Sequence, residues 1–229
     1  MTDPHPAPAE APLVEAARHA LLRRLAPALR HDAVASLQPI ALAGGVLERR
    51  LQQAPPDLKA VQGAAQQLID CSRHAVQSSL DLIAWLGLDA AQEAPLSHAV
   101  DHAVGLLQGA LGFRGIALRV QPPIDTAPVA GVRLRYLLPA CLLLLADGAS
   151  APAEILIRSP RASDPGAPDP APPQLLLSLV ATPDATGAHL HADAAAYRPL
   201  REDEVRALAA AENVALDWSG DTLTLTIAR

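Results

Sequence analysis

Cysteine is scarce in this sequence, and no redox motif is present. The chain has 229 residues and two cysteines, Cys71 and Cys141, with no CxxC pair. Two isolated thiols give no disulfide framework, so a reducing compartment is the simpler interpretation. GxSxG and a GxGxxG that follows a predicted strand are also missing, and these absences leave a serine hydrolase or a redox enzyme without support.

An excess of basic charge is missing as well. The chain carries 24 acidic and 18 basic residues, a net charge of -6. Such a chain offers no positive field to a phosphate backbone or to an anionic membrane surface. We therefore expect no nucleic-acid partner.

Long hydrophobic runs are lacking too. The longest, "LLPACLLLLA", contains a proline and falls well short of the roughly 20 residues that span a bilayer. The first segment, "MTDPHPAPAEAP", has neither a basic start nor an apolar core. Residues 1–12 are therefore expected to be a disordered leader and not a signal peptide. We expect no membrane contact and a cytoplasmic location.

Half of the residues are hydrophobic, which is enough for one large or two small domains, and we expect two. In the first part apolar residues recur every three or four positions, which predicts a long helix from residue 13 to 53, a break at "APPD" capped by Asp57, and a second helix over 58–86. The stripe of the first helix consists of Leu22, Leu25, Leu29, Ala33, Leu37, Ile40, Leu47 and Leu51. Residues 13–88 are therefore predicted to form an antiparallel helical hairpin.

Two helices alone leave part of both apolar stripes in water. A second copy of the hairpin would cover them in a four-helix bundle, so we expect a homodimer through this segment. The alternative is that the rest of the chain folds over the hairpin and completes the bundle.

A polar pair, His31 and Asp32, lies in the middle of the first helix. At 100° per residue His31 is about 200° round from Leu29, which is on the apolar stripe, so its side chain is expected to face solvent or a partner. Pro27 and Pro39 have no N–H to donate, and we expect a kink around His31. From this pattern alone, the pair is a solvated surface pair, a metal ligand, or a nucleophile that carries a phosphoryl group.

Residues 95–229 have a mixed pattern. It predicts one helical layer on one mixed sheet, an α/β sandwich, so that the whole chain is of the α+β class. The predicted helices are 96–111, 131–149 and 201–213, the strands are 115–120, 153–159 and 174–181, and a closing hairpin turns at Ser219 and Gly220. The segment 160–173 is too rich in proline to pack and is predicted to be a surface loop.

This order of elements resembles the core of a sensor histidine kinase. "LRHDAVASLQPI" is similar to the phosphoacceptor box of that family, in which an acidic residue follows the histidine. "ENVALDWSGDTLTLTIAR" is similar to the end of its ATPase domain. The resemblance implies a dimerisation hairpin followed by an ATPase-like sandwich.

The ATP site that the family requires is degenerate in this sequence. Ala140 and Leu144 stand where the family has two metal-binding asparagines, and neither side chain can ligate Mg²⁺. Of the Asp-x-Gly-x-Gly box only Asp184 and Gly187 remain, and "RPLREDEVRALAAAE" stands in place of the glycine-rich lid. We therefore expect no nucleotide and no resident cofactor.

A kinase-like chain with the histidine but without the ATP site resembles the dimeric histidine phosphotransferases of phosphorelays. That resemblance implies that His31 is the phosphoacceptor, that Asp32 orients its ring or accepts its proton, and that response-regulator receiver domains are the partners and supply Mg²⁺. Arg24 and Arg30 are the cations expected to contact the phosphoryl group or the acidic pocket of the receiver. Ala35 replaces the Thr or Asn common in kinases of the family, which argues against an efficient phosphatase activity.

Two other functions stay open: a scaffold that binds a receiver domain without transferring anything, and an active kinase with an unusual nucleotide site. A metal pair at His98 and His102, with Asp101 between them, has the required i, i+4 spacing, yet no third ligand is visible. A polar helix face is the simpler interpretation of those residues.

Overall fold

The computed structural model describes residues 11–86, 93–160, 172–181 and 198–228. The chain divides into two compact units. One is Ala26–Leu88, and the other joins the residues up to Leu25 with those from Asp89 onward. The expected boundary lay before the first helix, at residue 13, whereas the structure places Ala11–Leu25 with the second unit. Each unit is described separately below.

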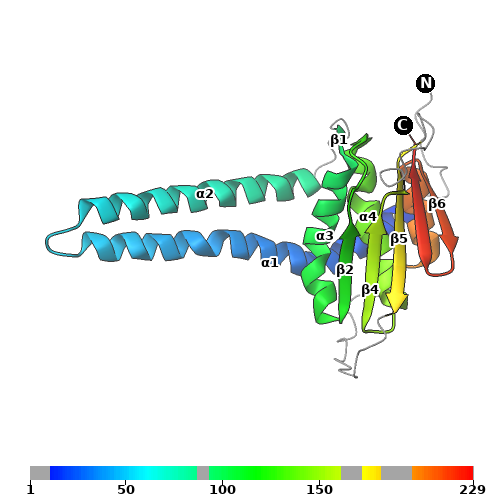
Figure 1. Ribbon diagram of the computed structural model, residues 1–229, viewed down its shortest axis with the longest axis horizontal. Coiled ribbons are helices and arrows are strands. Elements are labelled where there is room, and N and C mark those ends of the chain that lie inside the picture. The colour runs from blue at the N-terminus through cyan, green and yellow to red at the C-terminus, as the bar shows by residue number, and fades with distance from the viewer. Residues whose placement is uncertain (1–10, 87–92, 161–171, 182–197, 229) are drawn as a thin grey trace. The chain divides into compact units, whose positions relative to one another are not determined.

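The first unit contains a hairpin of two antiparallel helices, formed by residues 26–51 of α1 (Ala11–Leu51) and by α2 (Leu58–Leu86) (Figure 1). The predicted hairpin is therefore present. Helix α1 runs as one helix through both Pro27 and Pro39. The side chains buried between the two helices of this unit are small, which lets the backbones approach closely: Ser36, Ala43, Ala64 and Ala75.

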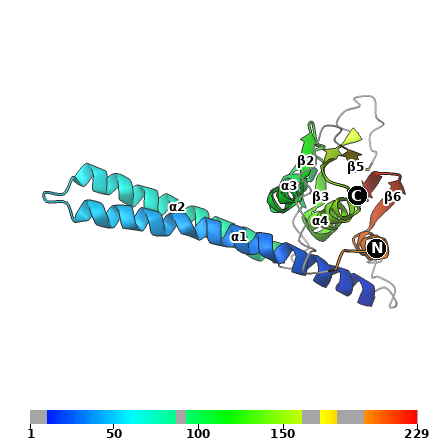
Figure 2. The ribbon, with the colours of Figure 1, turned by 90° about the horizontal axis from the view of Figure 1, so that it is seen from below.

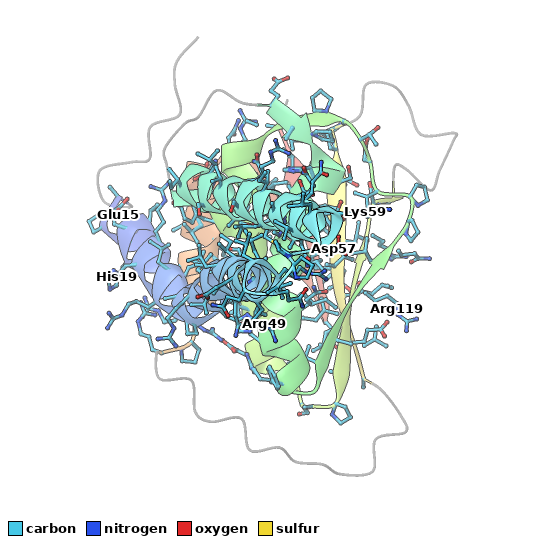
Figure 3. The ribbon with its side chains drawn as sticks, turned by 90° about the vertical axis from the view of Figure 1, so that its left-hand side faces the viewer. Glu15, His19, Arg49, Asp57, Lys59 and Arg119 are labelled. Carbon is cyan, nitrogen blue, oxygen red and sulfur yellow. The ribbon has the colours of Figure 1, made fainter. Side chains whose placement is uncertain are left out.

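Asp57 begins the second helix as the sequence predicts. Its carboxylate accepts hydrogen bonds from the backbone N–H groups of Lys59 (3.0 Å) and Ala60 (3.2 Å), which would otherwise lack a partner at the start of α2. Figure 3 shows Asp57 and Lys59 at this end of the hairpin, with Arg49 on the neighbouring helix. The cap fixes where α2 starts and therefore its register against α1.

The second unit is built on a five-stranded mixed sheet in the order β2-β4-β5-β7-β6. The strands are β2 (Ile116–Gln121), β4 (Ala153–Arg158), β5 (Gln174–Ala181), β6 (Val214–Ser219) and β7 (Thr222–Ile227). Strands β2 and β4 are parallel, and every other neighbouring pair is antiparallel. Two short strands that the sequence did not predict, β1 (Glu93–Pro95) and β3 (Pro128–Ala130), pair with each other beside it.

Three helices cover one face of this sheet: α3 (Leu96–Phe113), α4 (Gly131–Gly148) and α6 (Glu202–Ala211) (Figures 1 and 2). Alternate residues of each strand point into that layer, and Ile155, Leu177 and Leu223 are completely buried there. Each such side chain contributes about 1.5–3 kcal/mol on burial. The opposite face carries threonines, serine and charges, with Arg119 visible on that side in Figure 3.

The mixed α+β class and the predicted order of helices and strands after residue 95 are confirmed. Residues 1–10 of the expected leader, most of the proline-rich loop, and Asp184 and Gly187 lie outside the described residues. In the described ranges, none of the helices combines the length and the apolar character that a bilayer crossing requires.

Candidate functional site

His31 lies on the outer surface of α1 with its imidazole in solvent. The side chain is 82% exposed, and that of the adjacent Asp32 is 62% exposed. The Nδ1 atom of His31 is 3.6 Å from Oδ1 of Asp32, which is longer than a good hydrogen bond and within range of electrostatic attraction. Because Nδ1 faces the carboxylate, Nε2 is the ring nitrogen that remains accessible.

The hairpin has two different sides, which follow from helical geometry. With buried Ser36 as the inward direction and 100° per residue, His31 and Pro39 lie to one side of α1, whereas Val34 and Leu37 lie to the other. We call the first side the His31 side and the second the apolar side.

A groove of about 570 Å³ runs between the two helices on the His31 side. Ser36, the groove residue nearest to His31 along α1, is five residues further on, or about 7.5 Å of helical rise. Helix α2 contributes Gly63, where an added Cβ would meet nothing within 4 Å. The remaining lining comes from Pro39, Gln66, Gln67, Asp70, Cys71 and His74.

The apolar side carries large side chains that are exposed within the described chain. On α1, Leu37 is 54% exposed, and on α2, Val76 is 60% and Ile83 is 64% exposed. Ile69 and Leu80 extend the same row at helical spacing. The groove therefore lies opposite most of this apolar surface. His31 itself is only about 60° round α1 from exposed Val34, and Leu42, 69% exposed, lies on the His31 side.

The two arginines expected at the site have different environments. Arg30 is exposed on α1, one residue from His31. Arg24 is only 5% exposed, and its guanidinium forms a two-pronged ion pair with Asp147 of α4. Both terminal nitrogens of Arg24 donate to Asp147 within the second unit. We expected Arg24 to contact a phosphoryl group or a partner, but in the structure its role is structural. The sequence spacing could not reveal this, because the partner is 123 residues away.

A cluster of charges that the sequence did not predict surrounds the first turns of α1. Arg18 pairs with Glu212 at 3.0 Å, and Arg114 pairs with Asp147 at 3.0 Å. Burial raises the pKa of the Glu212 carboxyl above its usual range, although the neighbouring Arg18 opposes that shift. The one available signal was Asp147 itself, the single acid of a largely apolar helix whose other charged residues are Arg133 and Arg135.

The positions that match the nucleotide site offer no oxygen ligands. Ala140 is fully buried in α4, and Leu144 is half-buried. Burial also raises the pKa of the neighbouring Cys141 thiol to about 12, which keeps it protonated and unreactive. In the described residues no group of three or more His, Cys, Asp and Glu side chains is placed to hold a metal ion, and His98 and His102 lack a third ligand there.

No protein family and no curated protein matches the sequence. The solved structures that resemble the chain include a histidine kinase from Burkholderia phymatum STM815, with a TM-score of 0.39, 18% identity, and coverage of 87% of this chain and 95% of that chain. Another is the Acinetobacter baumannii histidine kinase AdeS, with a TM-score of 0.39, 15% identity, and coverage of 81% of this chain and 94% of that chain. The similarity to these two histidine kinases covers most of this chain at low sequence identity.

Proposed function

We propose that this protein is a histidine phosphotransferase of a phosphorelay, which accepts a phosphoryl group on His31 from one receiver domain and donates it to another without using ATP. The observation that carries the proposal is the imidazole of His31, which is 82% exposed on a regular helix with a carboxylate beside its Nδ1 atom. A buried or metal-bound histidine could not meet an aspartyl phosphate on another protein.

The chemistry requires a neutral imidazole with a free lone pair. The Nε2 lone pair of His31 attacks the phosphorus of an aspartyl phosphate, the bond from phosphorus to the aspartate oxygen breaks, and that aspartate leaves as a carboxylate. Asp32 attracts the Nδ1 proton, which favours the tautomer that keeps Nε2 unprotonated, and it stabilises the positive charge that develops on the ring. The reverse reaction delivers the phosphoryl group to the next receiver.

The groove on the His31 side gives the partner a place to dock. A receiver whose phosphorylated aspartate reaches His31 must cover the neighbouring surface, and the groove accepts a protruding apolar side chain there. Arg30 is exposed next to His31 and is suited to the acidic pocket of the receiver. Mg²⁺ belongs to that pocket in this scheme.

The apolar side suits a second copy of the hairpin. Two hairpins that pack through Leu37, Ile69 and Val76 would form a four-helix bundle and leave both His31 sides facing outward. The proposed assembly is therefore a homodimer with two independent phosphoacceptor sites.

The decisive experiment follows radioactive phosphate from a set of purified, phosphorylated receiver domains to the full-length protein. We expect an acid-labile, base-stable label on the wild type and none on His31→Gln. A set of receivers that never labels the wild type, or that labels His31→Gln equally, contradicts the proposal. Label that arrives directly from Mg²⁺-ATP would instead identify an active kinase.

A scaffold that only binds a receiver is the second candidate, because the groove itself does not include His31. In that case receivers bind the wild type and His31→Gln with equal affinity, and neither protein is labelled. Titration calorimetry beside the transfer assay distinguishes the two functions.

A further inference from the structure

The first turns of α1, Ala11–Leu25, pack on the outer side of the helical layer of the second unit. We call this segment the strap. Its buried side is mostly small and apolar, and Leu21 and Leu25 are completely covered. Figure 2 shows the strap, in dark blue, beside α6 and α4.

Ionic contacts hold the strap at two points. Arg18 donates to Glu212 at the end of α6, and its guanidinium lies over the ring of Tyr136 at 5.7 Å. One turn and a half further along, Arg24 donates to both carboxylate oxygens of Asp147 at the end of α4. The two arginines therefore contact α4 at two places, Arg18 at Tyr136 and Arg24 at Asp147.

The strap closes one particular face of α4. Tyr136, Ala140, Leu143 and Asp147 are spaced four, three and four residues apart, so they lie on the same side of that helix. Both end members of this row contact the strap, and Ala140 between them is 0% exposed. The covered face is thus the one that includes the position where the sequence lacks a metal-binding asparagine.

Several features distinguish the strap from the core beneath it. The sheet and helices α3, α4 and α6 form a core of their own, with residues such as Leu138 and Ile155 completely buried. Pro27 has no N–H, so α1 lacks one backbone hydrogen bond immediately after the strap. Among the described residues, the Nε atom of Arg18 is buried without a hydrogen-bond partner, which leaves the contact imperfect.

We propose that the strap is an intramolecular latch, which in its closed state seals the α4 face and which opens as a unit without unfolding the sandwich. Opening exposes an apolar surface with an acidic residue, Asp147 or Glu212, at each end. This surface fits an amphipathic helix with two basic residues six positions apart, which is the pattern of the strap itself. The proposal does not depend on phosphoryl transfer.

Hydrogen exchange on the full-length chain tests the latch. In the wild type, the amides of residues 14–25 should exchange at least about tenfold faster than those of β5 and β7, because the strap opens separately. Arg24→Glu replaces attraction to Asp147 by repulsion and should speed exchange in the strap and in residues 136–147 by a further tenfold or so, with β5 and β7 unchanged. His19→Glu is the matched control, since His19 points away from the sandwich on the same segment (Figure 3), and it should leave all three regions as in the wild type.

A synthetic peptide of residues 11–26 provides the second measurement. Added to Arg24→Glu, it should restore the slow exchange of residues 136–147, and it should have no effect on the wild type, whose α4 face is already covered. The latch is refuted if strap and sheet exchange at the same rate in the wild type, or if Arg24→Glu accelerates the sheet as much as the strap. Either result would make the strap an inseparable part of one cooperative fold.

Discussion

His31 projects from the middle of a helix of 41 residues, and its neighbour in the sequence decides how it is presented. Consecutive residues on a helix are 100° apart, so a carboxylate at the next position reaches only one edge of the ring. That edge is Nδ1, at 3.6 Å. The two ring nitrogens therefore differ: Nδ1 faces the carboxylate of Asp32, and Nε2 faces solvent.

Removal of the carboxylate should slow phosphoryl transfer without preventing docking. Asp32→Asn keeps the size of the side chain but loses the charge that stabilises the ring as it becomes phosphorylated. We expect the rate of transfer from a phosphorylated receiver to fall by about a hundredfold, as measured by rapid-quench labelling, with receiver affinity unchanged. Asp101→Asn, at an exposed site on α3, is the control, and equal rates for the two variants would remove Asp32 from the mechanism.

Asp147 is the other single residue with a large effect on the molecule. Its carboxylate forms ion pairs with both Arg24 and Arg114, and its side chain is only 15% exposed. A buried charge of this kind is costly to leave without its partner, whereas the intact pair contributes little net stability. The arginine that the sequence assigned to a partner is in fact neutralised by a residue of the same chain.

Truncation at this position should destabilise the strap and leave the sheet unchanged. Asp147→Ala leaves the Arg24 guanidinium without its carboxylate, and we expect the free energy of strap opening, measured by hydrogen exchange of residues 14–25, to fall by about 1.4 kcal/mol, equivalent to a tenfold faster exchange. Glu202→Ala breaks the half-exposed pair with Arg206 on α6 and should cost less than about 1 kcal/mol. If both variants lose a similar amount of stability, the pair of Asp147 with Arg24 is no stronger than an exposed surface pair, and the prediction is wrong.

At the scale of elements, the hairpin presents chemically different surfaces on its two sides. Small buried residues bring α1 and α2 close together, the groove opens on the His31 side, and most of the large exposed apolar side chains, Leu42 excepted, lie on the other side. The apolar period of three and four predicted both helices correctly. It did not reveal the groove, because residues of both helices, Pro39 and Gly63 among them, line it, and their approach depends on the antiparallel register.

Filling the groove should block the partner and leave His31 reactive. Gly63→Trp places a bulky ring where no atom lies within 4 Å of a new Cβ, so the fold has room for it. We expect transfer from receivers to slow about tenfold or more, equivalent to about 1.4 kcal/mol of lost docking energy. Phosphorylation by phosphoramidate, a small donor that needs no docking surface, should proceed at the wild-type rate.

The control for the groove is Gly109→Trp on α3, which is also exposed and has no atom within 4 Å of a new Cβ. It should leave both reactions unchanged. Loss of the phosphoramidate reaction in Gly63→Trp would mean that the substitution disturbs His31 itself, and the groove would then lose its assignment as a docking site.

At the scale of the whole molecule, the sequence predicted the class and the order of the elements but not the way they are grouped. The hairpin of β6 and β7 has clear alternation, and β5 is a short apolar run, as suits a central strand. These strands were found because local pattern and tertiary environment agree there. The short strands β1 and β3 were missed because each has only three residues, one of them a proline, and such a segment resembles a loop. The strap was misassigned for a different reason: its helical period is continuous with the rest of α1, and only distant residues decide which unit covers it.

The proposed dimer makes a prediction at the same scale. Ile69→Glu puts a charge in the centre of the apolar side, where the second copy would bury it without a partner. Sedimentation velocity should show the wild type as a dimer and Ile69→Glu as a monomer with unchanged helical content by circular dichroism. Gln67→Glu adds the same charge on the groove side and should remain dimeric, while a wild type that sediments as a monomer would contradict the assembly.

The distance along the chain between the strap and its anchors also has a consequence during synthesis. Arg18 leaves the ribosome first, but its partner Glu212 follows 194 residues later, so nearly the whole polypeptide must be translated before that contact can close. Until then the nascent helix exposes Leu21 and Leu25 to solvent, and chaperones recognise apolar surface of this kind. Complete closure of the strap therefore cannot precede the synthesis of α6.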